Sequence, residues 1–223
     1  MLALIPSTEK RVVQTRLCFY FPRVIPARPT SFATSCHALA DRWRLIAPDY
    51  PGAGYSGTPD NFNYSFGGYA DFLDSFVKAL SINRFALYLH DFGSPVGARL
   101  AIKAPDRVVA LITQNADIPY EDALGPKYAE IEKTWTLPVS EMREKLAEAI
   151  NEETFREEFL NDVRPELAAC IPPDLWKLHW SLMTPRRKEI ASASSRAYER
   201  TAPGSRSTLI PQRTPATDAM LSR

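Results

Sequence analysis

The sequence predicts an α/β fold with a mostly parallel sheet. Short apolar runs typical of buried strands alternate with segments whose apolar residues recur at helical spacing. This order requires crossover connections, which join parallel strands. The length of 223 residues fits one such domain with a small insertion.

The expected elements follow one another through the middle of the chain. Strands are expected at residues 43–47, 85–89 and 108–112. Phe72, Phe76 and Leu80 recur at four-residue spacing, which predicts one apolar face of a helix. Helices are therefore expected at residues 69–80 and 96–103, between the strands. Ligands of such sheets bind beyond the carboxyl ends of the strands.

The pattern changes after residue 119. Three amphipathic helical segments follow one another with no strand between them, at residues 141–150, 152–163 and 173–182. Such an insertion predicts a helical lid over the core, and ordinary sheet-covering helices are the alternative.

Glycine usage separates a well-specified middle from two doubtful ends. Eight of the 9 glycines lie between Gly52 and Gly125, although an α/β fold needs glycine at tight turns throughout. We therefore divide the chain into a poorly specified segment (1–37), a core (38–118), a helical lid (119–190) and an irregular tail (191–223).

Composition excludes several classes of partner. The net charge is +1, so neither a nucleic acid nor a membrane surface is indicated. The chain has no apolar run of the length of a membrane helix. The 3 cysteines lie far apart, which argues against a disulfide framework or a zinc site. We expect a cytoplasmic protein.

The most informative segment runs from Leu87 to Gly97. An apolar strand ends at Asp91, and a segment that can begin a helix follows at once. This is the outline of a nucleophile elbow, a sharp strand-to-helix turn that exposes one side chain. A carboxylate at that position can attack carbon and form an ester. The alternative is that Asp91 only caps the following helix.

Three motifs in this order resemble the α/β-hydrolase superfamily, in its epoxide hydrolase and haloalkane dehalogenase branch. Residues 49–56 resemble the loop D-x-P-G-x-G-x-S, and residues 90–94 resemble the elbow H-D-[WYF]-G-G. Residues 104–108 resemble the run x-P-x-R-V before the next strand. The resemblance implies an α/β-hydrolase fold whose final strands are missing here.

The resemblance also implies a reaction in two steps without a cofactor or metal. Asp91 is the implied nucleophile, and the backbone N–H of Phe92 contributes to the oxyanion hole. A phenylalanine ring has no donor for a halide, which favours an epoxide. His90 is expected to point away from the cleft and to pack or form hydrogen bonds.

The lid is expected to bind a small apolar organic substrate. Its tryptophans are the candidates for this contact: Trp135, Trp176 and Trp180. Packing within the lid is the alternative function of these side chains.

The family pattern requires a histidine after the lid, and this chain lacks one there. Its histidines are His37, His90 and His179. Without a base the ester would form but turn over poorly. A non-enzymatic remnant of the fold is therefore the second interpretation. Missing strands would leave an open sheet edge, through which we expect self-association.

The genetic code suggests a cause for both departures. Codons allowed for residues 23–37 and 191–205, read one base out of register, can encode family-like sequence. We expect that reading-frame shifts altered residues from about 17 to 37 and those after about 190. Resequencing of the gene tests this prediction, and an intact frame at both junctions would contradict it.

Overall fold

The computed structural model describes residues 15–21, 39–40, 43–91, 93–116, 150–161 and 163–199, together with Glu141 and Glu148. For residues 15–21 and 193–199 it describes the backbone alone. Every helix, strand and contact described for this protein lies within these residues.

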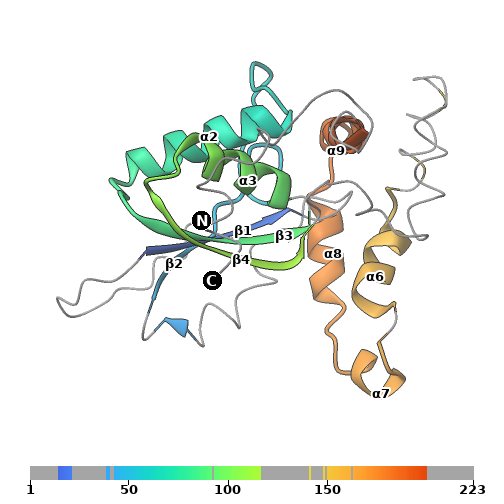
Figure 1. Cartoon of the computed structure of the whole chain (residues 1–223). Helices are drawn as coiled ribbons and strands as arrows, with labels where there is room; N and C mark the ends of the chain where they lie inside the picture. Colours follow the sequence, from blue (N-terminus) through green and yellow to red (C-terminus); the bar gives the residue numbers. More distant parts are fainter. Residues whose placement is uncertain are drawn as a thin grey trace.

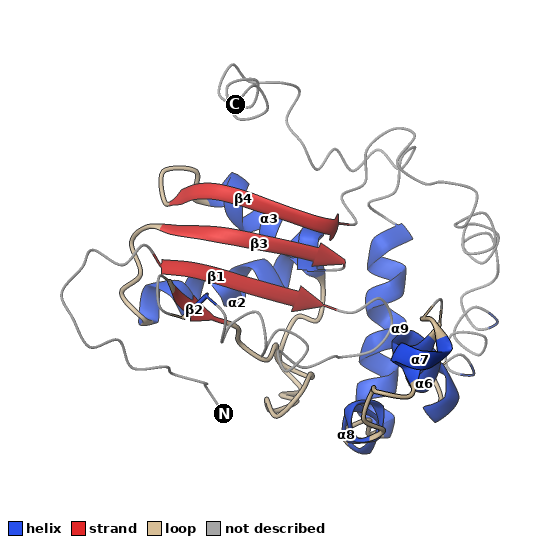
Figure 2. Cartoon of the chain, turned by 90° about the horizontal axis from the view of Figure 1, so that it is seen from below, coloured by secondary structure: helices blue, strands red, loops and turns tan. Residues whose placement is uncertain are grey.

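Four parallel strands form the sheet (Figure 2). They are β1 (Thr15–Phe21), β2 (Arg44–Ile46), β3 (Phe85–Asp91) and β4 (Val108–Ala116). The three strands expected from the sequence are confirmed. Strand β1 was not expected from the sequence, because it lies in the segment 1–37, which the residue pattern leaves poorly specified.

The spatial order of the strands is β2-β1-β3-β4. The chain therefore passes from β1 to β2 on one side and then crosses to β3 on the other side. A crevice forms at such a reversal, beyond the carboxyl ends of the two strands that flank it. Those strands are β1 and β3, and their last residues, Phe21 and Asp91, are paired in register.

Two helices cover one face of the sheet (Figure 1). They are α2 (Phe66–Ala79) and α3 (Gly93–Lys103), and both begin earlier than the sequence predicted. Helix α2 begins after Ser65, whose side chain accepts a hydrogen bond of 3.1 Å from the backbone N–H of Gly68. This is the usual way to satisfy a free amide at a helix start.

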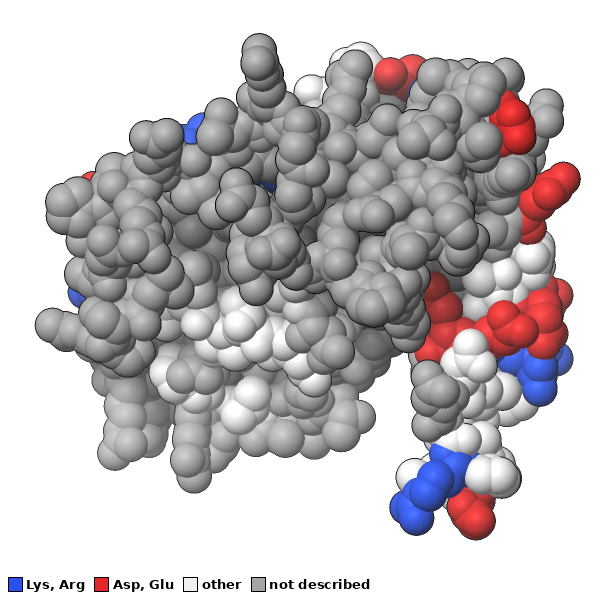
Figure 3. Space-filling model, turned by 45° about the vertical axis from the view of Figure 1, so that its right-hand side comes forward, with Lys and Arg blue, Asp and Glu red and all other residues white. Residues whose placement is uncertain are grey.

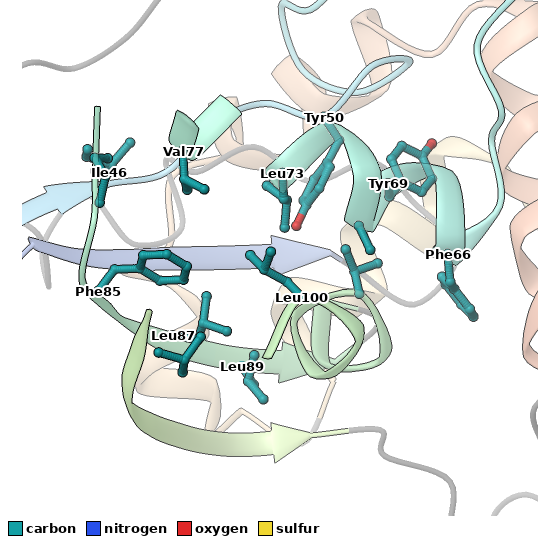
Figure 4. Packing of buried hydrophobic residues seen from close by; sticks show 14 of the residues in the cluster. Ile46, Tyr50, Phe66, Tyr69, Leu73, Val77, Phe85, Leu87, Leu89 and Leu100 are labelled. Carbon is teal, nitrogen blue, oxygen red and sulfur yellow. The ribbon is translucent and has the colours of Figure 1, made fainter. Parts of the chain in front are cut away.

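The main core lies between this pair of helices and the sheet (Figure 4). Phe85, Leu87 and Leu89 alternate along β3 and direct their side chains toward the helices. Leu73 and Leu100 meet them from α2 and α3. Complete burial of each such side chain contributes about 1.5–3 kcal/mol to stability.

An ion-pair network joins α2 to the end of α3. Asp74 on α2 accepts hydrogen bonds from Lys78 at 2.7 Å and from Arg107 at 3.2 Å. The Arg107 guanidinium also donates to the carbonyl oxygen of Ile82 at 2.6 Å and lies over the ring of Phe85. Arg107 belongs to the third family-like motif, which therefore has a structural function here.

Four helices follow β4 in the described chain. They are α6 (Glu152–Leu160), α7 (Pro165–Ala168), α8 (Asp174–Ser181) and α9 (Pro185–Glu199). Figures 1 and 2 both place this group beyond the carboxyl ends of the strands. Two of the three predicted helical segments, at 152–163 and 173–182, are confirmed as helices α6 and α8. The third, at 141–150, lies almost entirely outside the described residues.

These helices share a second buried cluster. It contains Ile150, Phe155, Trp176, Met183 and Ala191. The other side of α6 is acidic, with Glu152, Glu153 and Glu157 exposed, and Figure 3 shows acidic side chains on this side of the molecule. Helix α6 is therefore amphipathic, with one face in the cluster and one in solvent. None of the described helices is long and apolar enough to cross a membrane.

Helix α9 corrects the expected boundary at residue 191. The tail from 191 was expected to be irregular, but α9 continues through it to Glu199. Its start explains the difference, because Thr184 accepts a hydrogen bond of 3.3 Å from the N–H of Arg187 and Pro185 occupies the first helical position. Both features favour helix initiation. The sequence interpretation gave more weight to the polar, serine-rich composition of this segment.

We predict that Asp74 stabilises the fold in a pH-dependent way. The hydrogen bond from Lys78 and the charges of Lys103 and Arg107 lower the pKa of Asp74, although burial opposes them. A lowered carboxyl pKa contributes stability above the ordinary value of 3.8 that is lost as the pH falls through the folded-state pKa. Asp74→Asn should cost about 1–3 kcal/mol near pH 7 and progressively less in acid.

Urea unfolding of the wild type and the variant between pH 7 and the acid range measures this difference. Asp106→Asn is the matched control, because Asp106 is exposed in the turn before β4. A difference between wild type and Asp74→Asn that stays constant over the whole pH range would contradict the prediction.

Candidate active site

Asp91 lies where the sequence placed the nucleophile. It is the last residue of β3 and pairs with Phe21 of β1 and Ala116 of β4. The register of β3 and β4 shifts between His90 and Asp91, so the strand is irregular at this point. Helix α3 begins two residues later, at Gly93. Asp91 thus ends a strand at the point where the strand order reverses.

The backbone of Asp91 is in the left-handed region, with φ of 46°. Residues other than glycine adopt positive φ at a cost of about 1–3 kcal/mol, and such residues cluster at functional sites. A strained residue between a strand and a helix is the defining geometry of a nucleophile elbow. Helix capping alone gives no reason for this strain, since N-cap residues have extended backbone.

Close packing of α3 on β3 forms the other half of the elbow. A Cβ atom on Gly97 would lie 2.3 Å from Cδ2 of Leu89, so a larger residue would have to displace this buried side chain for the helix to approach the strand as closely. Ser94 occupies the position of the second glycine in the family-like elbow. Its side chain is completely buried, and its hydroxyl has no hydrogen-bond partner among the described residues.

His90 is held by the neighbouring strand. Its Nδ1 lies 2.7 Å from the carbonyl oxygen of Gln114 on β4. A carbonyl only accepts, so this nitrogen carries the proton. The geometry agrees with the expected packing and hydrogen-bonding function of His90.

The loop after β2 lies at the same edge of the sheet, and its motif is explained by its own hydrogen bonds. Oδ2 of Asp49 accepts from the N–H of Tyr55 at 2.9 Å. The Ser56 hydroxyl donates to the carbonyl oxygen of Asp49 at 2.7 Å. Gly54 has φ of 53°, and a Cβ atom there would lie 2.3 Å from Cγ of Asp49. The loop therefore needs Asp, Gly and Ser at these positions in order to fold.

The two described lid tryptophans pack inside the helical group. The Trp176 ring lies 6.5 Å from the Phe159 ring, and the Trp180 ring lies 5.5 Å from the Phe155 ring. His179 on α8 is buried, with its ring 5.6 Å from that of Phe159. These contacts match the packing function that the sequence left open, and substrate contact stays a prediction.

Two expected site residues, Phe92 and Trp135, lie outside the described part of the chain, as does His37. Their expected functions stay predictions. Among the described residues, no group of three His, Cys, Asp or Glu side chains could hold a metal ion.

Sequence reasoning missed one residue that contacts the loop after β2. Arg187 on α9 donates to the carbonyl oxygens of Gly54 and Ser56, both at 2.8 Å. The signal in the sequence was three consecutive cations after Pro185. Acidic residues are favoured in the first turn of a helix, so cations there indicate a tertiary contact.

Comparison with known proteins extends the resemblance. One matching relative is the uncharacterized hydrolase YNR064C of Saccharomyces cerevisiae, 39% identical over 103 residues. Haloalkane dehalogenase 2 of Mycobacterium bovis is 34% identical over 90 residues. These matches cover 46% and 40% of this chain but only 35% and 32% of the relatives. The matched segment thus spans about a third of each relative.

Solved structures show the same fold. Haloalkane dehalogenase DbeA from Bradyrhizobium elkanii superposes with a TM-score of 0.66 at 20% identity, over 99% of this chain and 74% of that one. Cfl2 from Burkholderia cenocepacia superposes with a TM-score of 0.64 at 21% identity, over 86% of this chain and 67% of that one.

A family model described as the alpha/beta hydrolase fold matches residues 26–190 of the 223. This range contains the elbow, the loop after β2 and helices α6 to α8. The parallel sheet and the solved structures agree with the match. The chain belongs to the alpha/beta hydrolase fold family.

Proposed function

We propose that this chain is a hydrolase-type protein whose nucleophile is Asp91. The observation that carries the proposal is the positive φ of Asp91 at the turn from β3 to α3. This geometry projects a side chain from the carboxyl edge of the sheet, beside the crevice between β1 and β3. A carboxylate in that position is suited to attack an electrophilic carbon.

The first step forms an ester. One carboxylate oxygen of Asp91 bonds to the substrate carbon, and the bond from that carbon to a halogen or to an epoxide oxygen breaks. A halide leaves with the bonding electrons, whereas an opened epoxide keeps its oxygen as an alkoxide that takes up a proton. Neither course needs an oxidant or a cofactor.

The second step needs a base. Water attacks the carbonyl carbon of the ester, loses a proton to the base, and releases the alcohol while the Asp91 carboxylate is restored. His90 is bonded to Gln114 through Nδ1, and His179 is buried beside Phe159. Because no described histidine has the placement of a base for this water, we propose that the ester accumulates.

The position of the helices beyond the ends of the strands supports the proposal that they form a lid over this site. Helices α6, α7 and α8 lie at the edge of the sheet where Asp91 ends β3 (Figure 1). An apolar lid excludes water and favours a small apolar organic substrate. Phe92 has no halide donor, which favours an epoxide, while relatives such as haloalkane dehalogenase 2 favour a halide. We also propose a cytoplasmic location, since the 3 cysteines show no disulfide spacing.

We predict covalent labelling of Asp91. Incubation with styrene oxide should add the full mass of the epoxide to the protein, and incubation with 1-bromohexane should add a hexyl group. Asp91→Asn removes the nucleophilic carboxylate and should lower the labelling rate by about 10³-fold or more. Intact-protein mass spectrometry and peptide mapping measure the adduct and its position.

Asp106→Asn is the control for this experiment, because it removes an exposed carboxylate in the turn before β4, at the opposite end of the strands from the elbow. It should label as the wild type does. Equal labelling of Asp91→Asn and the wild type, or an adduct that maps to another residue, would contradict the assignment of Asp91.

The exposure of β4 favours a second candidate, a remnant of the fold that associates through its sheet. Residues 109–114 are all exposed, with Val109, Leu111 and Ile112 at 37%, 42% and 36%. Strands of parallel sheets are normally buried on both faces and rich in Val, Ile and Leu, as β4 is. An exposed apolar edge strand is a template for pairing with another chain.

We predict concentration-dependent association through β4. Leu111→Lys places a charge on the strand and should shift the protein toward the monomer in light scattering coupled to size exclusion. Ile102→Lys, which changes an exposed apolar residue of α3, should leave association unchanged. A monomer at every concentration, or an equal effect of both variants, would exclude β4 as the contact.

A further inference from the structure

Helix α9 contacts both the cluster of the helical group and the loop after β2. Ala191 belongs to the helical cluster with Phe155 and Trp176. The preceding residue, Ile190, lies against the loop after β2, because a Cβ atom on Gly52 would approach it to 3.4 Å. Helix α9 therefore joins the helical group to the edge of the sheet.

Arg187 supplies the polar part of this junction. Its Nη1 donates to the carbonyl oxygens of Gly54 at 2.8 Å and Leu182 at 2.9 Å. Its Nη2 donates to the carbonyl oxygen of Ser56 at 2.8 Å, and Nε lies 3.3 Å from the hydroxyl of Thr58. One planar guanidinium thus holds the loop after β2 and the end of α8 together, which a single ammonium cannot do.

Helix formation alone does not favour the cations at the start of α9, so their presence points to the tertiary contact of Arg187. The first turn of α9 contains no acid and carries Arg186, Arg187 and Lys188, which oppose the helix dipole. Lys188 lies 4.5 Å from the ring centre of Trp180 on α8. Leu182 follows the last residue of α8, so Arg187 also meets the negative end of that helix.

The loop that Arg187 holds is itself rigidly built. Besides the bonds to Asp49, the N–H of Gly52 donates to the carbonyl oxygen of Gly57 at 2.8 Å. The Tyr69 hydroxyl on α2 donates to the carbonyl oxygen of Pro51 at 3.2 Å. A helix attached to this loop is therefore attached to the core of the sheet.

We infer that Arg187 is a positioning residue that fixes helices α6 to α8 over the carboxyl edge of the sheet through the loop at residues 54–58. The effect on substrate rests on the proposed function of Asp91, whereas the attachment itself does not. An arginine is needed at this position, because three carbonyl oxygens and a hydroxyl require a planar group with several donors.

Hydrogen exchange measured by mass spectrometry tests the attachment. Arg187→Lys keeps the charge and loses the fork of donors, so exchange should rise about tenfold or more in residues 52–58 and at the end of α8. Arg186→Gln is the matched control, since Arg186 bonds to Glu189 on its own helix at 3.0 Å and reaches Asp60, outside residues 52–58, only through an exposed ion pair of 4.0 Å. It should leave both segments unchanged, and β3 should stay protected in every variant.

Labelling kinetics of Asp91 test the consequence for the site. Arg187→Lys should raise the concentration of styrene oxide at half-maximal labelling rate several-fold and leave the maximal rate nearly unchanged, because the lid and not the nucleophile is altered. Asp91→Asn should abolish labelling without changing exchange at residues 52–58. The two proposals can therefore fail separately.

Two results would overturn the inference. One is equal exchange at residues 52–58 in Arg187→Lys and Arg186→Gln. The other is a uniform rise of exchange that includes β3, which would show a general loss of stability. Absence of labelling in the wild type would instead contradict the proposed function and leave the exchange result to decide on Arg187.

Discussion

The contact between α3 and β3 is the constraint on which the site depends. Because Gly97 lies directly against Leu89, the helix begins close above the end of the strand, and the chain must turn within two residues. The positive φ of Asp91 follows from this short turn. The free energy of apolar packing in the core thereby offsets the backbone strain at the carboxyl edge of the sheet. Strained residues at functional sites usually arise in this way.

The motif at residues 49–56 shows that family-like residues near a site need not take part in the chemistry. Asp49 accepts the N–H of Tyr55, and Gly54 leaves room for its carboxylate. Arg107 in the third motif likewise joins α2, the carbonyl oxygen of Ile82 and the ring of Phe85. The elbow, in contrast, contains Asp91, the residue that we propose as the nucleophile, at the carboxyl edge of the sheet. The other motifs hold the surfaces around it.

The sequence predicted the elements whose apolar pattern is regular. Strand β3 and helix α2 were recognised because Phe85, Leu87 and Leu73 lie on faces that local periodicity reveals. Strand β1 and helix α9 were missed, since β1 is defined by pairing with residues distant in sequence and α9 by contacts to a loop more than a hundred residues earlier. The elbow is encoded locally and was predicted, whereas the contacts of Arg187 are not.

The position of β1 has a consequence for how the sheet assembles. Strand β2 joins the sheet through β1, which pairs with β3 on its other side. The first of the described strands is thus an interior strand, and its withdrawal would divide the sheet rather than shorten it. A folding chain must close the long loop from β1 to β3 before the sheet is continuous, which raises the contact order and slows folding. Assembly of the crevice beside Asp91 therefore waits on residues near the amino end.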